Sequence, residues 1–321
     1  HLADATGRRK IYLLGTASFA LVTALLTLSQ TAAMLIACRI LQGISAAMIF
    51  GTGMAILTSV YPPQKRGQAL GFSTAVTYAG LSTGPVLGGI MNQNLGWRSI
   101  FYLTALIGLL AAVFIFKGLQ GEWIGNKEAS FDARGSFLYI ISISAFLYGL
   151  SSLGNMGWAK YIAALGLALL AVFVLIELKA PHPILQAGLF RHNRTFTFSN
   201  MAALINYSAT FAITFLLSLY LQLVRGYTSQ QAGMILLVQP VIMAIFSPLS
   251  GTLSDKFAPR IVASLGMGLS TAGLFGLIFL QPDFSMWGLL GLQGLIGLGF
   301  ALFSSPNTNA VMSSVPPRFY G

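Results

Sequence analysis

The stretch Gly80–Gly89 reads GLSTGPVLGG and lies inside a long apolar run of the chain. Gly80, Gly84 and Gly88 recur every four residues, so they share one face of a helix. In a membrane, small residues at this spacing let two helices approach closely, and a proline within the helix bends it. The stretch therefore predicts a membrane-spanning helix with a glycine face and a bend at Pro85. On its own it is also consistent with a general packing seam.

The composition is that of a protein embedded in a membrane. Hydrophobic residues make up 55% of the 321 residues and charged residues 8%, whereas soluble proteins carry about 25% charged residues. The net charge of +11 does not indicate nucleic-acid binding, because the basic residues lie in short connectors rather than in one patch. The single cysteine, Cys38, excludes a disulfide framework and disfavours a cysteine metal site. We expect no cofactor, no bound metal and no nucleic-acid partner.

Apolar runs long enough to cross a hydrocarbon core of about 30 Å recur along the whole chain. Because charges, prolines or polar clusters bound these runs, they predict ten spans. The predicted spans are Ile11–Ser29, Ala33–Val60, Gly67–Met91, Ser99–Lys117, Gly135–Leu153, Ala159–Leu178, Thr195–Leu223, Ser229–Leu253, Ile261–Leu280 and Ser285–Val315.

The connectors between these spans alternate in charge. Fourteen of the 18 Lys and Arg residues lie in the connectors on the side of the opening loop, and three lie on the other side. Cytoplasmic loops are rich in Lys and Arg, so the basic side is predicted to be cytoplasmic in a plasma (inner) membrane. The cytoplasmic loops are then those that contain Asp4, Lys65, Lys127, Arg191, Asp255 and Arg318.

Two of these loops resemble each other. The segment His1–Lys10 reads HLADATGRRK, and Gly251–Arg260 reads GTLSDKFAPR. Both fit the pattern Leu-x-Asp-x-x-(Gly/Ala)-x-Arg, in which Asp4 corresponds to Asp255. Such a repeat is expected of a transporter built from two related halves. Each copy alone is equally consistent with an ordinary charged turn whose Asp caps a helix.

A further motif, Leu-x-x-x-Arg-x-x-Gln-Gly, is formed by Leu35, Arg39, Gln42 and Gly43. With these motifs the chain resembles the major facilitator superfamily over essentially its whole length, and specifically the fourteen-span multidrug:proton antiporters. In that family the Asp loop joins the second and third helices, and the Arg motif lies in the fourth helix. The GxxxGPxxGG element, here Gly80–Gly89, lies in the fifth helix and is typical of exporters.

The resemblance implies an all-α polytopic membrane protein with the major facilitator fold, in which two pseudo-symmetric helical bundles flank two inserted helices. Residues 1–117 would form four spans of the N-terminal bundle, 118–194 the linker loops and two inserted spans, and 195–321 four spans of the C-terminal bundle. Eight predicted spans separate the two Asp loops, where a plain duplication of six-helix halves would place six. By the repeat, about two helices would lie beyond each end of a fragment of a longer transporter.

Arg39 is predicted to lie well inside a span, about 10 Å from its outer end at 1.5 Å per residue. An arginine at membrane depth is costly and usually functional, although its long side chain can also extend to the interface. Gln42, Gly43 and Ala46 continue the same helix face as polar or small residues, which favours a cavity. The resemblance implies that Arg39 and Gln42 take part in proton coupling, close to a carboxylate in a first helix that precedes this fragment.

The resemblance also implies conformational roles for the repeated loops and the glycine helix. The gating loops would comprise Asp4, Gly7, Arg8, Arg9, Gly251, Asp255, Lys256 and Arg260. The antiporter motif helix would comprise Gly80, Gly84, Pro85, Gly88 and Gly89, whose glycine face would seal or hinge the outer side against the opposite half.

Polar side chains within apolar spans are candidates for a substrate cavity. They are Tyr78, Asn206, Tyr207, Gln239, Gln293, Asn307 and Asn309. Each could instead form an interhelical hydrogen bond worth about 0.6 kcal/mol.

The predicted function is proton-driven export of amphiphilic or cationic small molecules by alternating access. The expected partners are the lipid bilayer, the substrate, protons and an unidentified outer-membrane export partner. A major facilitator transporter of one specific metabolite is the alternative. A membrane-embedded enzyme is disfavoured because no cluster of His, Asp or Glu lies at membrane depth, and a non-transporting sensor is a remote alternative.

Overall fold

The computed structural model describes residues 3, 6–124, 132–180 and 187–316. These ranges form helices joined by turns and contain no strand. Asp4, Lys127 and Arg318, to which the sequence assigned a loop position, lie outside them. The long helices are α2 (Arg8–Leu26), α3 (Ala32–Val60), α4 (Arg66–Leu95), α5 (Arg98–Gly118), α6 (Ala133–Ser151), α7 (Ala159–Glu177), α9 (Arg194–Leu219), α11 (Val238–Lys256), α12 (Pro259–Leu277) and α13 (Met286–Ser313). Shorter helical segments are Pro63–Lys65, α8 (Ala187–His192), a π-helical turn at Tyr220–Val224 and α10 (Ser229–Leu236).

Each predicted span corresponds to one long helical segment of the described chain. Eight of these segments are long and apolar enough to cross a membrane, and α4 and α6 are the two long helices not among them. α4 is rich in Gly, Ser and Thr, which lowers its hydropathy and fits a helix that packs against protein rather than lipid. The count of ten spans is therefore approximate, whereas the all-helical membrane architecture is confirmed.

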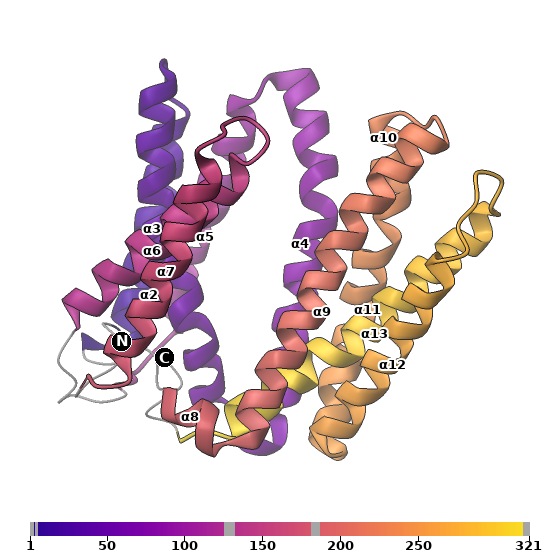
Figure 1. Ribbon diagram of the computed structural model, residues 1–321. Helices are drawn as coiled ribbons and strands as arrows, with labels where there is room; N and C mark the ends of the chain where they lie inside the picture. The colour runs from indigo at the N-terminus through magenta and orange to yellow at the C-terminus, as the bar shows by residue number, and fades with distance from the viewer. Residues whose placement is uncertain (1–2, 4–5, 125–131, 181–186, 317–321) are drawn as a thin grey trace.

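The helices alternate in direction between two ends of the molecule (Figure 1). We call the lower end in that view, which carries α8 and the connectors at Lys65 and Phe257, the basic end. α4 and α9 leave the basic end, and α3 and α11 return to it. We call α2–α5 the first half and α9–α13 the second half. Within the first half, α2 packs against α3 and α5, whereas α4 packs mainly against α11 of the second half.

The predicted span Ser229–Leu253 is divided into α10 and α11 at Leu237. The break has a local cause, because Pro240 has no N–H to donate to the carbonyl of Leu236. A capping box at the start of α10, in which Thr228 and Gln231 exchange hydrogen bonds, fixes the other end of this short helix.

The helices α6 and α7 pack chiefly against each other. A Cβ placed on Gly149 would lie 2.7 Å from the Cα of Ala163, and one on Gly166 would lie 2.6 Å from the Cα of Phe146. The backbones of this hairpin therefore approach as closely as glycine allows. Asp132 caps the start of α6 by accepting a hydrogen bond from the amide of Gly135.

At the end opposite the basic end, the second half is tied together by side chains. Arg225 donates to the carbonyls of Pro282 and Phe284 at 2.8 and 2.7 Å, and Tyr220 donates to the carbonyl of Gln281. These bonds join the α9–α10 connector to the α12–α13 connector.

Candidate substrate cavity and gate

A glycine seam joins the two halves at the basic end. Gly67 and Gly71 of α4 face Gly251 of α11, so that a Cβ on Gly71 would lie 2.6 Å from the carbonyl oxygen of Ser247 and 3.0 Å from the Cα of Gly251. The atoms in the way belong to the backbone and cannot rotate aside. Only glycine permits this contact, which we call the α4–α11 seam.

Asp255 closes the seam electrostatically. Its carboxylate accepts hydrogen bonds from the backbone amides of Gly67 and Gln68 at 2.7 and 2.8 Å. These amides belong to the first turn of α4, where no residue of the same helix can accept from them, and Lys65 at the N-cap provides no side-chain bond. The carboxylate of the second half thus caps a helix of the first half, next to the positive end of its dipole.

The other residues of the repeated loops hold shorter-range contacts. Gly7 has φ = 117°, which favours glycine, and it precedes α2. Arg8 is buried and donates to the Oγ of Ser59 at 3.1 Å. Arg9 donates to the carbonyl of Leu119 at the end of α5. Lys256 ends α11 and Arg260 lies in the first turn of α12.

Glu122 lies in the connector after α5, and although it is exposed its carboxylate accepts a hydrogen bond from the amide of Arg9 at 2.8 Å. It therefore binds the start of α2 rather than only solvent.

Replacing Asp255 by Asn should slow transport by about tenfold without preventing membrane insertion. The substitution removes the charge and one acceptor, and a hydrogen bond to a charged group contributes about 1.5–3 kcal/mol. Initial efflux rates at matched expression measure the effect. Asp132→Asn is the matched control, because Asp132 caps its own helix in the same way without bridging the halves. Equal rates in wild type and Asp255→Asn would contradict the role of the cap.

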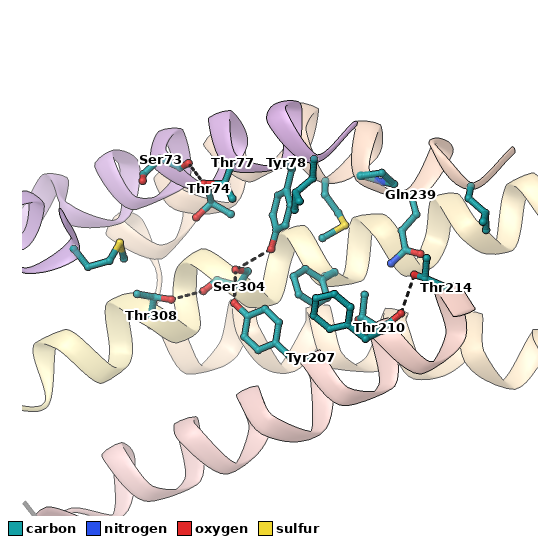
Figure 2. Close-up of a pocket in the computed structure, with 17 residues that line it drawn as sticks. Ser73, Thr74, Thr77, Tyr78, Tyr207, Thr210, Thr214, Gln239, Ser304 and Thr308 are labelled. Carbon is teal, nitrogen blue, oxygen red and sulfur yellow. Dashed lines mark hydrogen bonds between the residues drawn. The ribbon is translucent and has the colours of Figure 1, made fainter. Parts of the chain in front are cut away.

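A cavity of about 460 Å³ lies beside the seam, between α4 and the helices α9, α11 and α13 (Figure 2). Its size falls within the range of small-molecule sites. The lining residues are Met54, Ser73, Thr74, Thr77, Tyr78, Leu81, Tyr207, Thr210, Phe211, Thr214, Leu236, Gln239, Pro240, Met243, Phe300, Ser304 and Thr308.

Three hydroxyl groups converge in this cavity. The phenol of Tyr78 donates to the Oγ of Ser304 at 3.3 Å, and the phenol of Tyr207 lies 3.3 Å from the same oxygen (Figure 2). Tyr78 belongs to α4, whereas Tyr207 and Ser304 belong to the second half. The cluster therefore bridges the two halves, as the seam does.

The same tyrosines flank one phenylalanine. The ring of Phe300 packs edge to face with Tyr78 at a centroid distance of 5.8 Å and with Tyr207 at 5.2 Å. Phe300, Tyr78 and Met243 are buried together. Edge-to-face geometry is the favoured arrangement of aromatic pairs, so these contacts hold the phenol oxygens in place.

Three of the seven candidate cavity residues, Tyr78, Tyr207 and Gln239, line this cavity. Whether they bind substrate stays a prediction.

The other four candidates lie between helices. Asn206 contacts the sulfur of Met267 at 2.9 Å, Asn307 donates to the carbonyl of Ser199, and Asn309 donates to Ser254. Gln293 is fully buried in α13.

Ser304 and the lining threonines were not among the candidates from the sequence. The sequence holds only a weak indication of these residues. Helical spacing places Tyr207, Thr210 and Thr214 on one helix face, and Ser304 and Thr308 on another. Serine and threonine are common in membrane helices, where they also bond their own backbone, so the spacing alone does not reveal a cavity.

A second cavity of about 410 Å³ surrounds Arg39 and is lined also by Gln42, Gly43 and Ala46, the residues predicted to share its helix face. The guanidinium donates to the Oε1 of Gln42 at 2.9 Å, and the Nε2 of Gln42 donates to the Oγ1 of Thr23 at 2.8 Å. Hydrogen bonds therefore connect Arg39 on α3 with α2.

Phe101 of α5 lies beside the same charge, with its ring centroid 5.0 Å from the guanidinium carbon of Arg39. A cation–π contact stabilises a charge away from water. The structure places Arg39 in a cavity between α2, α3 and α5, and a role in proton coupling stays a prediction.

The glycine face that predicted a close helix contact is unoccupied within the described part of the chain. A Cβ on Gly80, Gly84 or Gly89 would meet no atom within 4 Å, and one on Gly88 would meet only the Cδ1 of Ile100, at 3.9 Å. α4 therefore packs on the second half near the basic end, whereas its glycine face makes no close contact. Sealing of the outer side by this face stays a prediction.

Known proteins similar in sequence show to which family the chain belongs. The model of the Major Facilitator Superfamily matches residues 1–321. The chain belongs to the major facilitator superfamily. This transporter is 31% identical over 320 residues to the riboflavin transporter RibZ of Clostridioides difficile, matching all of this chain and 70% of that protein. It is 33% identical over 328 residues to the multidrug resistance protein Stp of Mycobacterium tuberculosis, matching all of this chain and 60% of that protein.

The fold agrees with the family. The crystal structure of the human organic anion transporter MFSD10 superimposes with a TM-score of 0.69 at 17% identity, covering 99% of this chain and 67% of that chain. The family and the apolar helices make the chain part of a multi-pass membrane transporter rather than an enzyme. It spans 60–70% of the length of the two relatives described above.

Proposed function

We propose that the full protein exports amphiphilic small molecules by alternating access, driven by proton influx. The observation that carries this proposal is the cavity beside a closed α4–α11 seam, with contacts between the halves at the basic end and a free glycine face on α4 at the other. The basic connectors favour a cytoplasmic position for the basic end. The described state is then the one that is shut toward the cytoplasm.

Two observations support the direction of transport and its coupling. The GxxxGPxxGG element is typical of exporters, and the relative Stp is a multidrug resistance protein. Arg39, which is predicted to lie at membrane depth and is bonded to Gln42, would supply the positive charge that a proton-binding carboxylate needs as a partner. The Asp255 cap and the seam would open and close once in each cycle.

Export is tested in cells that express the full protein and are loaded with a fluorescent amphiphile. Efflux should be at least about fivefold faster than in cells lacking the gene, and collapse of the proton gradient with a protonophore should abolish the difference. A strain that expresses Asp255→Ala controls for the burden of overexpression. Efflux that persists after the gradient is collapsed would contradict proton coupling, and accumulation instead of efflux would contradict export.

Transport of one specific metabolite is the second candidate, because RibZ is described as a riboflavin transporter. The two candidate functions differ in the number of compounds that the protein would transport. An exporter of many compounds should protect cells against several unrelated amphiphiles, whereas a specific transporter should move one compound and leave the others unaffected.

A further inference from the structure

We infer that the cavity between α4 and the second half takes an uncharged aromatic ligand with a hydrogen-bonding group, and that Ser304 is its specificity-determining residue. The inference rests on the proposed transport function and narrows its substrate class. Three properties of the cavity carry it: the charge of its lining, its aromatic wall and its hydroxyl cluster.

The residues that line the cavity disfavour a charged ligand. Among the seventeen described lining residues there is no Asp, Glu, Lys, Arg or His. An ion taken out of water without a partner of opposite charge is penalised by several kcal/mol. Asp255, the carboxylate of the seam, is occupied by the amides of α4, and Arg39 lies in the other cavity. A ligand cation or anion would therefore find no opposite charge among these residues to offset its lost hydration.

The aromatic and apolar side chains that line the cavity favour a ligand with an aromatic ring. Phe300 packs between Tyr78 and Tyr207. Tyr207 is 40% exposed, so it is the member of this aromatic cluster that offers surface to a ligand. Phe211 and Leu81, which are 75% and 59% exposed, add apolar surface from α9 and α4. A flat apolar ring gains from contact with such surfaces, both by burial of area and by aromatic packing.

The hydroxyl cluster is incompletely bonded. Tyr78, Tyr207 and Ser304 carry three O–H donors and more acceptor sites, yet two bonds of 3.3 Å join them. Bonds between hydroxyl groups are usually 2.7–2.8 Å long. A ligand carbonyl or hydroxyl placed between these groups would form shorter bonds than they form with one another. Because the three groups come from both halves, such a ligand would contact both.

The test uses the full-length protein in lipid nanodiscs and two fluorescent probes of similar ring size. Nile red is uncharged and carries a ring carbonyl, whereas ethidium is a permanent cation. We expect saturable binding of Nile red above the signal of empty nanodiscs, and no displacement of it by ethidium. Ser304→Ala should weaken binding by about three- to tenfold, since one neutral hydrogen bond is lost.

Three further variants make the result specific. Tyr78→Phe and Tyr207→Phe remove one hydroxyl each and keep the ring, so each should weaken binding by a similar factor. Ser142→Ala is the matched control, because Ser142 is a buried serine like Ser304 but lies on α6 and bonds its own backbone. Its binding should equal that of wild type.

The outcomes separate this inference from the proposed function. Saturable binding and efflux of ethidium without binding of Nile red would overturn the inference and leave export intact. Nile red binding that is unchanged in Ser304→Ala and both phenylalanine variants would overturn the assignment of the site. Absence of efflux of any amphiphile from cells would count against the proposed function itself, whatever the nanodiscs bind.

Discussion

Gly71→Val should open the α4–α11 seam and strongly reduce net transport. The new side chain would overlap the carbonyl oxygen of Ser247 and the Cα of Gly251, and overpacking of this kind costs about 1–3 kcal/mol. The state with the seam closed would lose population by about 5- to 150-fold, since 1.4 kcal/mol is a factor of ten. Efflux should fall by a similar factor while the protein still reaches the membrane.

A cysteine reporter measures the seam directly. Ser305 is fully buried and donates to the carbonyl of Gly67, so Ser305→Cys in a Cys38→Ser background should react slowly with an impermeant maleimide. Gly71→Val should make it react faster from the basic end. Gly84→Leu, on the same helix, should leave it protected, because Gly84 faces open space, and should still block transport if the outer side must close. Slow reaction in both variants would contradict the seam as a gate.

Arg39→Ala should reduce proton-driven efflux by about 10- to 100-fold. The guanidinium bonds Gln42 and faces Phe101, and a hydrogen bond to a charged group contributes about 1.5–3 kcal/mol. Without this charge, a nearby carboxylate would stay protonated throughout the cycle. Substrate exchange across the membrane, which needs no net proton movement, should continue, and Arg39→Lys should fall between wild type and Arg39→Ala.

Arg98→Ala is the matched control for Arg39. Arg98 also bonds neighbouring groups, the carbonyls of Thr27 and Ser29, and lies over the ring of Trp97 at 4.4 Å. It lines neither of the two cavities described here. Proton-driven efflux should therefore be close to that of wild type. Efflux that is equally high in Arg39→Ala would show that Arg39 does not couple transport to protons.

The helices could be predicted from sequence because membrane spans depend on local composition. From the apolar run, the predicted start of α3 is Ala33, one residue after the observed start at Ala32. The division at Leu237 was missed, although Pro240 carried the local signal for it. The face that Arg39 shares with Gln42 followed from helical periodicity alone, and the structure places both on one cavity wall.

The gate and the cavity depended on contacts between distant segments. The repeat singled out Asp255, but nothing in the sequence indicated that its carboxylate would cap α4, 187 and 188 residues away. In the sequence, nothing distinguishes Ser304 from any other serine of an apolar helix. Its role becomes visible only in the structure, where Tyr78 and Tyr207 both contact its hydroxyl group. Conversely, the glycine face at Gly84 predicted a contact that the described conformation does not contain.

The hairpin of α6 and α7 has a consequence for biosynthesis. Because Gly149 and Gly166 let the two helices contact each other closely, and only seven residues separate them, each helix finds its main packing partner as soon as both have left the ribosome. The pair can enter the membrane as a unit before the second half is translated. A hairpin of two helices also returns the chain to the side from which it started, so the helices that follow it keep the orientation they would have without it.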